Sequence, residues 1–441
     1  MIRRRIRPSR DRVAAAVAFG VPVVLVAVLH GWAGTSLVGS SMLLLLVAKL
    51  VVARRERRRG RNLTYRLAPS LAVAAVVPMH NEDPDLAVAA IRSMLAQTRP
   101  IARIHVVDDG STDGGAAADA VEQVLRHQDS CRDWIVTRLA RNVGKRNAMA
   151  VAFRAAPDAD VFLCVDSDTV LDVDAVEHGL KPFADPTVSA VAGLVLALNW
   201  RRNLLTRLID LRYVSAFLAE RAAYSYFGAV LCCCGSLSFY RSHVVREHLD
   251  DFVDQRFLGR TATFGDDRRL TNYALRSGRV VLVEQSRAQT AVPERLGHYV
   301  RQQVRWNKSF IRESSWVLGT FPVRHGAFWL TLTEIVGWII IGSLTLAGLV
   351  IAPFLVESRS FWLFVALTSS AAYARNASYV EHVRAEVGLR QRLAVLALAP
   401  LYAAIHIGLL LPIRFYALVT LRRGGWGTRR DIEVRLAPAG G

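Results

Sequence analysis

Closely spaced aspartates in the middle of the chain are the residues whose type and spacing point most directly to chemistry. Asp166 and Asp168 form an Asp-x-Asp pair directly after the apolar run 161–165. Carboxylate oxygens are hard ligands that suit Mg²⁺ or Mn²⁺, and these ions keep phosphate oxygens as further ligands. The pair therefore indicates a place where a divalent cation is held against a diphosphate, and the alternative interpretation is a solvated turn.

A second pair, Asp108 and Asp109, follows the apolar run 104–107 and precedes Gly110 and Ser111. Two carboxylates at the end of a strand can accept hydrogen bonds from a nucleobase or a ribose. The same residues also form ordinary turns, because Asp, Gly and Ser all favour them. This pair alone is a weak signal.

The third pair, Asp266 and Asp267, lies between Gly265 and the helical stretch 269–276. Transfer of a sugar from a nucleotide diphosphate needs a base that takes the proton of the acceptor hydroxyl. A positioned carboxylate is a suitable base. Because Asp is also favoured at the start of a helix, a helix cap is the alternative.

The stretch 299–308 contains Gln302, Arg305 and Trp306 and leads towards an apolar region. An arginine can bind a leaving diphosphate through charge-assisted hydrogen bonds, and a tryptophan can stack on the apolar face of a sugar. An amphipathic helix at a membrane surface would show the same pattern. The order of these four motifs along the chain is more specific than any one of them.

The elements that must position these residues follow from the apolar pattern between residues 71 and 320. Short apolar runs predict buried parallel strands, and helical stretches alternate with them. Such alternation predicts an α/β domain with a doubly wound sheet, which binds ligands at the carboxyl ends of its strands. The predicted strands are 71–77, 104–107, 135–139 and 161–165, and two of the predicted helices are 84–97 and 144–156.

Both ends of the chain predict membrane segments. Hydrophobic residues make up 52% of the 441 residues, and the mean hydropathy is +0.25. A helical hairpin is expected at the N-terminal end, because two apolar runs follow one another there. The run 393–421 contains Pro400, Pro412 and Arg414, so it is expected to be bent or re-entrant rather than one plain span. The apolar runs are 13–30, 36–53, 328–352, 361–374 and 393–421.

The formal net charge of +19 also bears on the membrane prediction. Much of the excess arginine flanks apolar runs, within residues 3–12, 54–61 and 422–430. Cytoplasmic flanks of membrane helices carry such charge, and anionic lipid heads attract it. We therefore expect membrane lipids rather than nucleic acid as the partner of these basic segments, with the central domain on the cytoplasmic side.

The five cysteines do not form a spaced disulfide or zinc pattern. Cys232, Cys233 and Cys234 are consecutive, and adjacent cysteines cannot easily bridge one another. Small buried thiols in a reducing compartment are the expected state.

The motifs together resemble the family-two processive glycosyltransferases, which include the hyaluronan, cellulose and chitin synthases. The resemblance covers residues 70 to 320 and continues into the apolar region. Within the family, segments 268–273, 302–310 and 426–429 look most like bacterial hyaluronan synthases. The residues that carry it are 77–82 (Val-Pro-Met-His-Asn-Glu), 107–111 (Val-Asp-Asp-Gly-Ser), 144–146 (Gly-Lys-Arg), Asp166-Ser167-Asp168, 265–268 (Gly-Asp-Asp-Arg) and Gln302-x-x-Arg305-Trp306.

The resemblance implies a GT-A type, Rossmann-like domain inserted between N- and C-terminal transmembrane helices. The expected parts are a basic tail with a helical hairpin (1–62), a cytoplasmic glycosyltransferase domain (63–320), a C-terminal transmembrane region (321–421) and a basic cytoplasmic tail (422–441). It also implies a multi-pass protein of the plasma membrane. The oligomeric state is not indicated.

Roles for individual residues also follow from the resemblance. It implies that Asp267 is the catalytic base beside Asp266, that Asp168 is the metal ligand, and that Asp166 lies at the diphosphate. Asp108 or Asp109 and Lys145 would contact the nucleotide, while Gln302, Arg305 and Trp306 would hold the diphosphate and the acceptor end. The segment 232–241 resembles the part of the family that primes the acceptor.

Two residues depart from the family pattern. His80 stands where the family often has Tyr, which affects recognition of the base. Ser236 follows Gly235 where hyaluronan synthases tend to have Pro, which affects the sugar specificity.

The activity implied is that of an inverting, processive enzyme that uses UDP-sugar donors and Mg²⁺ or Mn²⁺ to extend a growing polysaccharide. Hyaluronan from UDP-GlcNAc and UDP-GlcA is the expected product, and a chitin-like polymer or poly-N-acetylglucosamine from UDP-GlcNAc alone is the alternative. A non-processive transferase acting on a lipid is disfavoured by the motif at Gln302. A transporter without chemistry is disfavoured because the acidic motifs lie outside the apolar runs.

Overall fold

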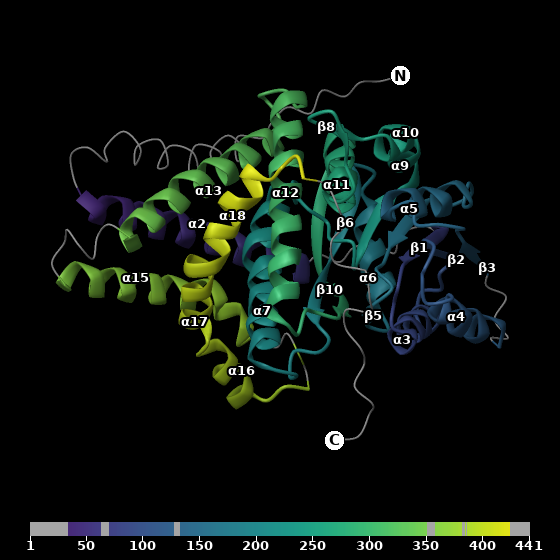
Figure 1. Ribbon diagram of the computed structural model, residues 1–441, viewed down its shortest axis with the longest axis horizontal. Coiled ribbons are helices and arrows are strands. Elements are labelled where there is room, and N and C mark those ends of the chain that lie inside the picture. Colours follow the sequence, from purple (N-terminus) through teal and green to yellow (C-terminus); the bar gives the residue numbers. More distant parts are fainter. Residues whose placement is uncertain are drawn as a thin grey trace.

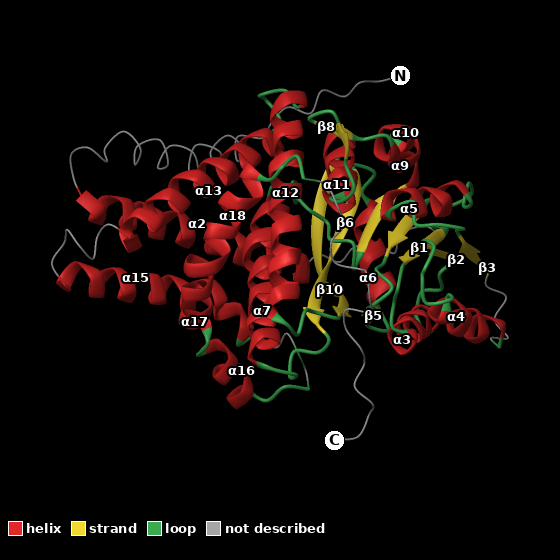
Figure 2. Ribbon diagram, viewed as in Figure 1, coloured by secondary structure: helices red, strands yellow, loops and turns green. Residues whose placement is uncertain are grey.

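The computed structural model describes residues 34–62, 70–127, 133–350, 358–381, 384 and 386–423. The expected membrane run 13–30 and the tail beyond residue 423 lie outside these residues. Within them, an α/β domain lies beside a group of long helices (Figure 1). Figure 2 shows the strands gathered on one side and helices alone on the other.

A mixed sheet of eight strands forms the centre of the α/β domain. Its strands are β1 (Val73–Met79), β2 (Arg103–Asp108), β3 (Asp133–Arg138), β4 (Val161–Cys164), β5 (Thr169–Leu171), β6 (Val188–Ala197), β7 (Ser238–Arg241) and β10 (Arg279–Thr290), and a separate small sheet holds β8 (Arg256–Phe257) and β9 (Arg260–Thr261). The order across the large sheet is β3-β2-β1-β4-β7-β6-β10-β5. The four strands predicted from the sequence are confirmed as β1 to β4, within two residues at each end.

The sheet has a parallel half and a mixed half. β1 runs parallel to β2 and β4, and β2 runs parallel to β3. The expectation of a doubly wound parallel sheet is correct for this half and wrong for the rest. β7 is antiparallel to both β4 and β6, and β5 is antiparallel to β10. β7 comes late in the chain but inserts between two earlier strands, so its place depends on long-range packing rather than on local pattern.

Helices cover both faces of the sheet, and the alternation of side chains along β1 explains why. Val73, Ala75 and Val77 face a core formed with α3 (Pro84–Leu95) and α4 (Ala116–Arg126). Ala74 and Val76 face the opposite core, formed with α5 (Lys145–Arg154) and α11 (Asp266–Ser277). Successive side chains of a strand point to opposite faces, so a strand that is apolar throughout must be buried on both sides.

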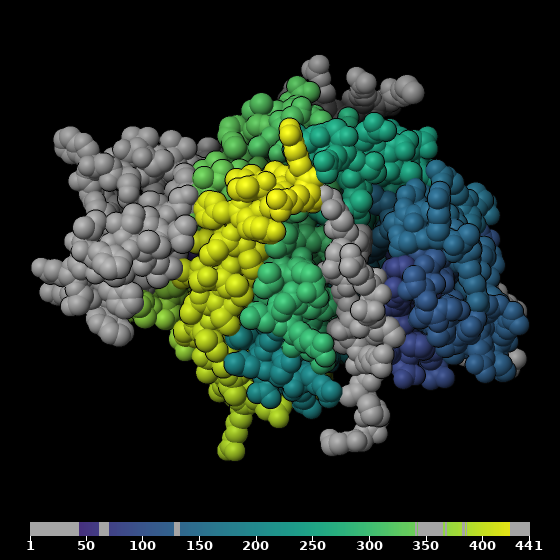
Figure 3. All heavy atoms as spheres, viewed as in Figure 1, coloured from purple at the N-terminus to yellow at the C-terminus, as the bar shows by residue number. Residues whose placement is uncertain are grey.

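Further helices complete the domain and continue away from it. The shorter ones are α6 (Ala175–Leu180), η1 (Lys181–Ala184), α7 (Leu204–Ser215), η2 (Ala216–Arg221), α8 (Ala222–Tyr226), α9 (Ser242–Glu247) and α10 (Leu249–Val253). The longer or later ones are α2 (Gly34–Asn62), α12 (Leu296–Thr320), α13 (Gly326–Val350), α15 (Ser358–Asn376), η3 (Ala377–Tyr379), α16 (Leu389–Leu396), α17 (Ala399–Ile405), η4 (His406–Leu410) and α18 (Leu411–Val419). Figure 3 shows the C-terminal helices, in yellow, lying along α12 beside the α/β domain.

One helical stretch among the described residues, Leu389–Val419, is long and apolar enough to cross a membrane, with a mean hydropathy of 2.1. It consists of α16, α17, η4 and α18, and Pro400 and Pro412 lie in the first turns of α17 and α18. A shorter apolar helical stretch covers Gly326–Ile339. The set of several transmembrane helices expected on both sides of the domain is thus reduced, in the described residues, to one candidate. The bent or re-entrant course of 393–421 stays a prediction.

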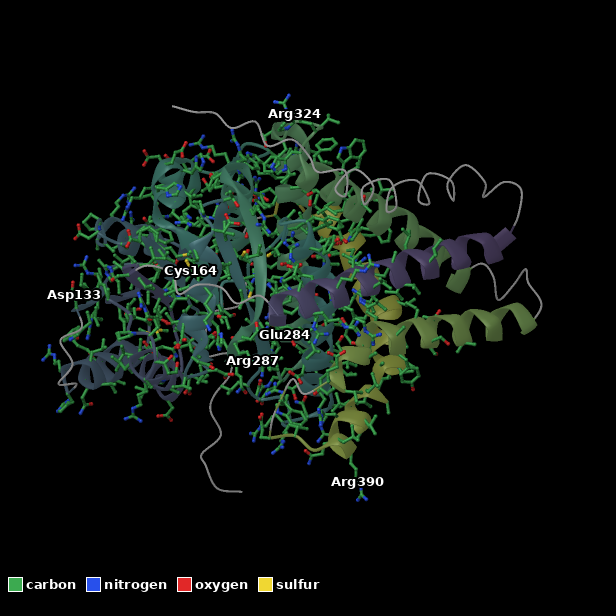
Figure 4. All side chains as sticks on the ribbon, turned by 180° about the vertical axis from the view of Figure 1, so that it is seen from behind. Asp133, Cys164, Glu284, Arg287, Arg324 and Arg390 are labelled. Carbon is green, nitrogen blue, oxygen red and sulfur yellow. The ribbon has the colours of Figure 1, made fainter. Side chains whose placement is uncertain are left out.

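Buried ion pairs fasten the helices to the sheet. Arg57 of α2 donates two hydrogen bonds of 2.9 Å to the carboxylate of Glu284 in β10 and one of 2.6 Å to Glu381. In Figure 4, Glu284 lies where the sheet meets α2. Asp210 of α7 is fully buried and accepts hydrogen bonds from Arg384 at 2.8 Å and Tyr379 at 2.7 Å. Tyr379 and Arg384, which follow α15, are therefore packed against the domain.

Candidate active site

A cavity of about 820 Å³ lies between the carboxyl ends of β1 and β4, the start of α11 and the side of α12. Nine of the ten residues expected to act line this cavity, namely Asp109, Lys145, Asp166, Asp168, Asp266, Asp267, Gln302, Arg305 and Trp306. Asp108 is the exception, because its carboxylate is bound by Ser111 in the adjoining turn. The structure thus brings together motifs that lie up to about two hundred residues apart in the sequence, as expected for ligand sites at strand ends.

Asp108 and Asp109 have different surroundings at the end of β2. Asp108 accepts hydrogen bonds from the backbone N–H of Ser111 at 3.2 Å and from its hydroxyl at 2.5 Å, so it closes the turn. Asp109 accepts from the backbone N–H groups of Val143 and Gly144 at 2.7 and 2.9 Å. Burial raises the pKa of Asp109, although those two hydrogen bonds oppose the shift. Of the pair, Asp109 is therefore the one that faces the cavity.

Gly110 explains how the Asp109 turn can approach the neighbouring loop. Its φ of +64° is in the left-handed region that favours glycine. A Cβ at this position would lie 2.3 Å from the backbone carbon of Arg141. Any other residue would therefore push the 141–144 loop, which carries the N–H groups that bind Asp109.

Lys145 stands at the start of α5 and contacts two of the acidic motifs. Its ammonium lies 2.5 Å from Oδ1 of Asp166 and 3.4 Å from Oδ2 of Asp266. Ser236 donates a hydrogen bond of 3.0 Å to the other oxygen of Asp166. Ser236, one of the two residues that depart from the family pattern, is therefore part of the site. It helps to orient Asp166, the first aspartate of the Asp-x-Asp pair.

Asp168 has a different set of neighbours. Its Oδ1 accepts hydrogen bonds from the hydroxyls of Thr290 at 3.0 Å and Thr169 at 3.2 Å. Thr290 ends β10, far along the chain, and nothing in its local sequence marks it as part of the site. No group of three or more His, Cys, Asp or Glu side chains within the described residues could hold a metal ion. A cation held by Asp168 would take further oxygen ligands, and the phosphate oxygens of a bound diphosphate are suitable ones.

Asp266 and Asp267 form the first turn of α11. Gly265 precedes them with a φ of +83°, and a Cβ there would lie 2.2 Å from the hydroxyl oxygen of Ser309 in α12. Oδ1 of Asp267 accepts a hydrogen bond of 2.7 Å from the backbone N–H of Arg268. Burial, and then the neighbouring charge of Asp266, raise the pKa of Asp267. A carboxylate with a raised pKa is a better proton acceptor than an ordinary Asp.

The cysteine triplet lies beside this carboxylate. The thiol of Cys232 is 3.5 Å from Oδ2 of Asp267, and Cys232 and Cys234 line the cavity while Cys233 is buried in the core. Burial raises the pKa of Cys232 to about 12, so the group is a neutral thiol at neutral pH. The expectation of buried thiols is confirmed for Cys164 and Cys233, whereas Cys232 and Cys234 are half-buried and line the cavity.

The helix α12 provides the opposite wall. Gln302, Arg305 and Trp306 all line the cavity, and Trp306 remains 43% exposed. The ring of Tyr213 in α7 lies 6.4 Å from that of Trp306, which gives a pair of aromatic faces at one end of the cavity. Tyr213 carries no motif in the sequence, so only the fold identifies it. Aromatic faces of this kind suit the C–H faces of sugar rings.

Comparison with known proteins identifies the family. Residues 74–249 match the model of "Glycosyl transferase family 2". The chain is 40% identical over 367 residues to a hyaluronan synthase of Streptococcus pyogenes, which covers 82% of this chain and 84% of that protein. It is 36% identical over 369 residues to an N-acetylglucosaminyltransferase of Bradyrhizobium diazoefficiens, which covers 82% of this chain and 72% of that protein.

Among solved structures, the chain is similar to the mannosyltransferase PcManGT of Pyrobaculum calidifontis, solved in complex with GDP-Man and Mn²⁺. The TM-score is 0.52 at 18% identity, and the match covers 89% of this chain and 99% of that one. This likeness supports the fold alone. The family match and the identity to the synthases over most of the chain show that this chain belongs to glycosyl transferase family 2 and is a hexosyltransferase related to the hyaluronan synthases.

Proposed function

We propose that the chain is a processive, inverting synthase that builds a β-linked polysaccharide from UDP-sugar donors, and that hyaluronan is its product. The observation that carries this proposal is that donor-type and acceptor-type residues line one cavity. Asp109, Lys145 and Asp168 are the donor-type residues, Trp306 is the acceptor-type residue, and Asp267 lies at the start of α11 in the lining of the same cavity.

The donor side holds the nucleotide and its diphosphate. Asp109 is fixed by two backbone N–H groups at the end of β2, where it can accept a hydrogen bond from the base. The ammonium of Lys145 can exchange its contact with Asp166 for one with a phosphate oxygen, since both partners are anionic oxygens. Asp168 supplies the carboxylate for a divalent ion. Such an ion, Mg²⁺ or Mn²⁺, would stabilise the charge that develops on the leaving diphosphate.

The acceptor side performs the proton transfer. The hydroxyl of the acceptor sugar forms the new bond to the anomeric carbon while the bond from that carbon to the diphosphate breaks. Asp267 takes the hydroxyl proton, and the nucleotide leaves as a diphosphate. One displacement inverts the configuration, so an α-linked donor gives a β-linked product. Trp306 would stack on the acceptor, and Arg305 would bind the diphosphate.

The basic residues near Asp267 bear on whether the donor carries a carboxylate. Four arginines near the motifs of Asp267 and Trp306 are candidates for this role, namely Arg260, Arg268, Arg269 and Arg305, and of these Arg268 and Arg305 line the cavity. Arg269 does not qualify, because it is 3% exposed and its guanidinium lies 3.0 Å from Glu313. Arg260 is exposed and does not line the cavity. Among these four arginines, Arg268 and Arg305 are therefore the ones placed to bind the carboxylate of a glucuronate donor.

The experiment that tests the product is to supply purified enzyme with UDP-GlcNAc alone, UDP-GlcA alone and both together. High-molecular-weight polymer should form only with both donors, and hyaluronan lyase should digest it. Polymer from UDP-GlcNAc alone would favour the alternative, a chitin-like synthase, which the similarity to the N-acetylglucosaminyltransferase also allows. The catalytic assignments are the same for both products.

We also propose that the chain is a multi-pass protein of the plasma membrane with its α/β domain in the cytoplasm. The apolar stretch Leu389–Val419 and the arginines at the end of α2 support this topology. The test is labelling of single added cysteines in intact cells with an impermeant thiol reagent. A cysteine at Arg58 should be shielded and one at Ser358 should react. Labelling of a cysteine at Arg58 would show that this end of α2 faces outward and that the proposed topology is wrong.

A further inference from the structure

A buried network of charged side chains connects the catalytic turn to α12 and α5. Its centre is the carboxylate of Glu313 in α12, which is 2% exposed. This carboxylate accepts hydrogen bonds from Gln255 at 2.8 Å and Arg312 at 2.9 Å, and the guanidinium of Arg269 lies 3.0 Å away. A buried carboxylate with this many donors is strongly anchored, because each partner would be left with an unsatisfied group if it moved.

The network reaches the backbone just before Asp267. The carbonyl oxygen of Phe264 accepts hydrogen bonds from the guanidinium groups of both Arg312 and Arg146. Arg146 also donates to the side-chain oxygen of Gln255, which links it back to Glu313. Phe264 is followed at once by Gly265 in its left-handed conformation and then by the acidic pair. The position of that pair is therefore tied to the arginines on two helices.

The same two helices carry other residues of the site. Arg146 follows Lys145, which contacts the Asp-x-Asp pair. Glu313 lies seven residues after Trp306 on one continuous helix, roughly 10 Å along its axis. The network thus joins three groups that must meet at the reacting atoms, namely the lysine of the donor side, the base and the aromatic acceptor platform.

We infer that Glu313 is a positioning residue for sugar transfer, which keeps the carboxylate of Asp267 in line with the acceptor hydroxyl by fixing the 264–267 turn against α12. Glu313 touches no substrate itself, since it does not line the cavity. The inference rests on the proposed role of Asp267 as the base. A base that is displaced by an ångström loses much of its effect, because the reacting groups no longer meet in the productive geometry.

The experiment compares Glu313→Gln and Arg312→Lys in the full-length protein. Glu313→Gln keeps the size of the side chain and removes its charge. Arg312→Lys keeps the charge, but a single ammonium cannot span both Glu313 and the Phe264 carbonyl. For each variant, kcat, the donor KM, thermal unfolding and the ratio of UDP released to sugar incorporated are measured. The kinetic values are given per molecule that binds UDP.

The expected result is a decrease of roughly 10- to 100-fold in kcat for transfer, with the donor KM changed by less than about twofold. The ratio of UDP released to sugar incorporated should rise, because water can still attack the donor when the acceptor is misaligned. A general loss of stability would lower sugar transfer and hydrolysis of the donor together, and it would leave this ratio unchanged. If Glu313→Gln does not fold, Arg312→Lys decides the question.

The matched control is Asp210→Asn, which removes the charge of another fully buried carboxylate that binds an arginine outside the cavity. This variant should lower the unfolding temperature and leave kcat and the ratio unchanged. The inference is overturned if Asp210→Asn raises the ratio equally, or if the folded Glu313 and Arg312 variants keep the wild-type kcat and ratio. Failure of the proposed function would show separately, as normal turnover in Asp267→Asn.

Discussion

The ends of the parallel strands and the helix α12 present functional side chains in different states. At the strand ends, two carboxylates of the cavity are already held by the protein. Asp109 is bound by two backbone N–H groups, and Asp166 is bound by Lys145 and Ser236. On α12, by contrast, Trp306 is 43% exposed.

Gln302, which also lies on α12, differs from the strand-end carboxylates in the same way. Its side-chain oxygen is buried and has no hydrogen-bond partner within the part of the chain that the structure describes. Buried oxygens are rarely left in this state unless a ligand or water binds them. The carboxylates of Asp109 and Asp166 are thus held before the substrate arrives, whereas Gln302 and Trp306 on α12 still have bonding capacity. This difference suits an enzyme that binds each donor in one place and lets its product move on.

Removal of the divalent cation should have the largest effect, because it acts on the donor side as a whole. Chelation should abolish transfer, and Asp168→Ala should weaken the metal-dependent binding of UDP. Transfer is followed by incorporation of labelled sugar, and UDP binding by calorimetry with and without added Mn²⁺. The control is Asp254→Ala, which removes an exposed carboxylate outside the cavity. Full activity in the presence of chelator would show that no cation is needed.

Replacement of the proposed base, Asp267, should affect sugar transfer without affecting UDP binding. Asp267→Asn keeps the shape of the side chain and removes the proton acceptor, so transfer should decrease by roughly 10²-fold or more. Binding of UDP should stay close to that of the wild-type protein, because the donor side is intact. Stopped-time incorporation assays and UDP titration measure the two quantities. Near-normal turnover would leave Asp267 with no role beyond the start of α11.

The aromatic pair on the acceptor side should control how long the enzyme keeps its product. Trp306→Ala removes a stacking face, which is worth about 1 kcal/mol beyond its buried area, so dissociation of the polymer should be roughly 5- to 10-fold faster. Trp306→Phe keeps an aromatic face and should restore most of the product length. Product length is measured by gel electrophoresis at fixed turnover, and the donor KM should not change. Unchanged product length in Trp306→Ala would argue against an acceptor site at α12.

The division of the central sheet into a parallel and a mixed half explains what the sequence could and could not predict. The parallel half was predictable because each strand is a short apolar run that ends directly in an acidic motif, so local pattern and chain order agree with the fold. The mixed half was not, because β7 inserts between β4 and β6 and because β10 pairs with strands from much earlier in the chain. Pairings of that kind depend on tertiary packing.

The site shows the same limit at the level of single residues. Asp168 and Asp267 stand in recognisable motifs, and the structure places both in the cavity. Thr290 and Tyr213 come from segments without any motif, yet Thr290 binds Asp168 and the ring of Tyr213 lies beside that of Trp306. The network around Glu313 is also hidden in the sequence, since its charged residues resemble those of a solvated helix face until their burial is known.

The smallest expected effect is a shift in pH dependence caused by the like charges of Asp266 and Asp267. The carboxylate of Asp266 raises the pKa of Asp267, after burial, which contributes more. A base works in its deprotonated form, so transfer is lost as the pH falls through this raised pKa. Asp266→Asn removes the like charge and should lower the pKa of Asp267. The acidic limb of the pH profile should therefore move to lower pH.

Because Asp266 also lies 3.4 Å from the ammonium of Lys145, kcat must be measured at saturating donor. Asp254→Asn, with the same change of charge at an exposed position, should leave the limb in place. An acidic limb that stays fixed or moves to higher pH in Asp266→Asn would mean that the charge of Asp266 does not raise the pKa of Asp267, and the raised pKa would then have to come from burial alone.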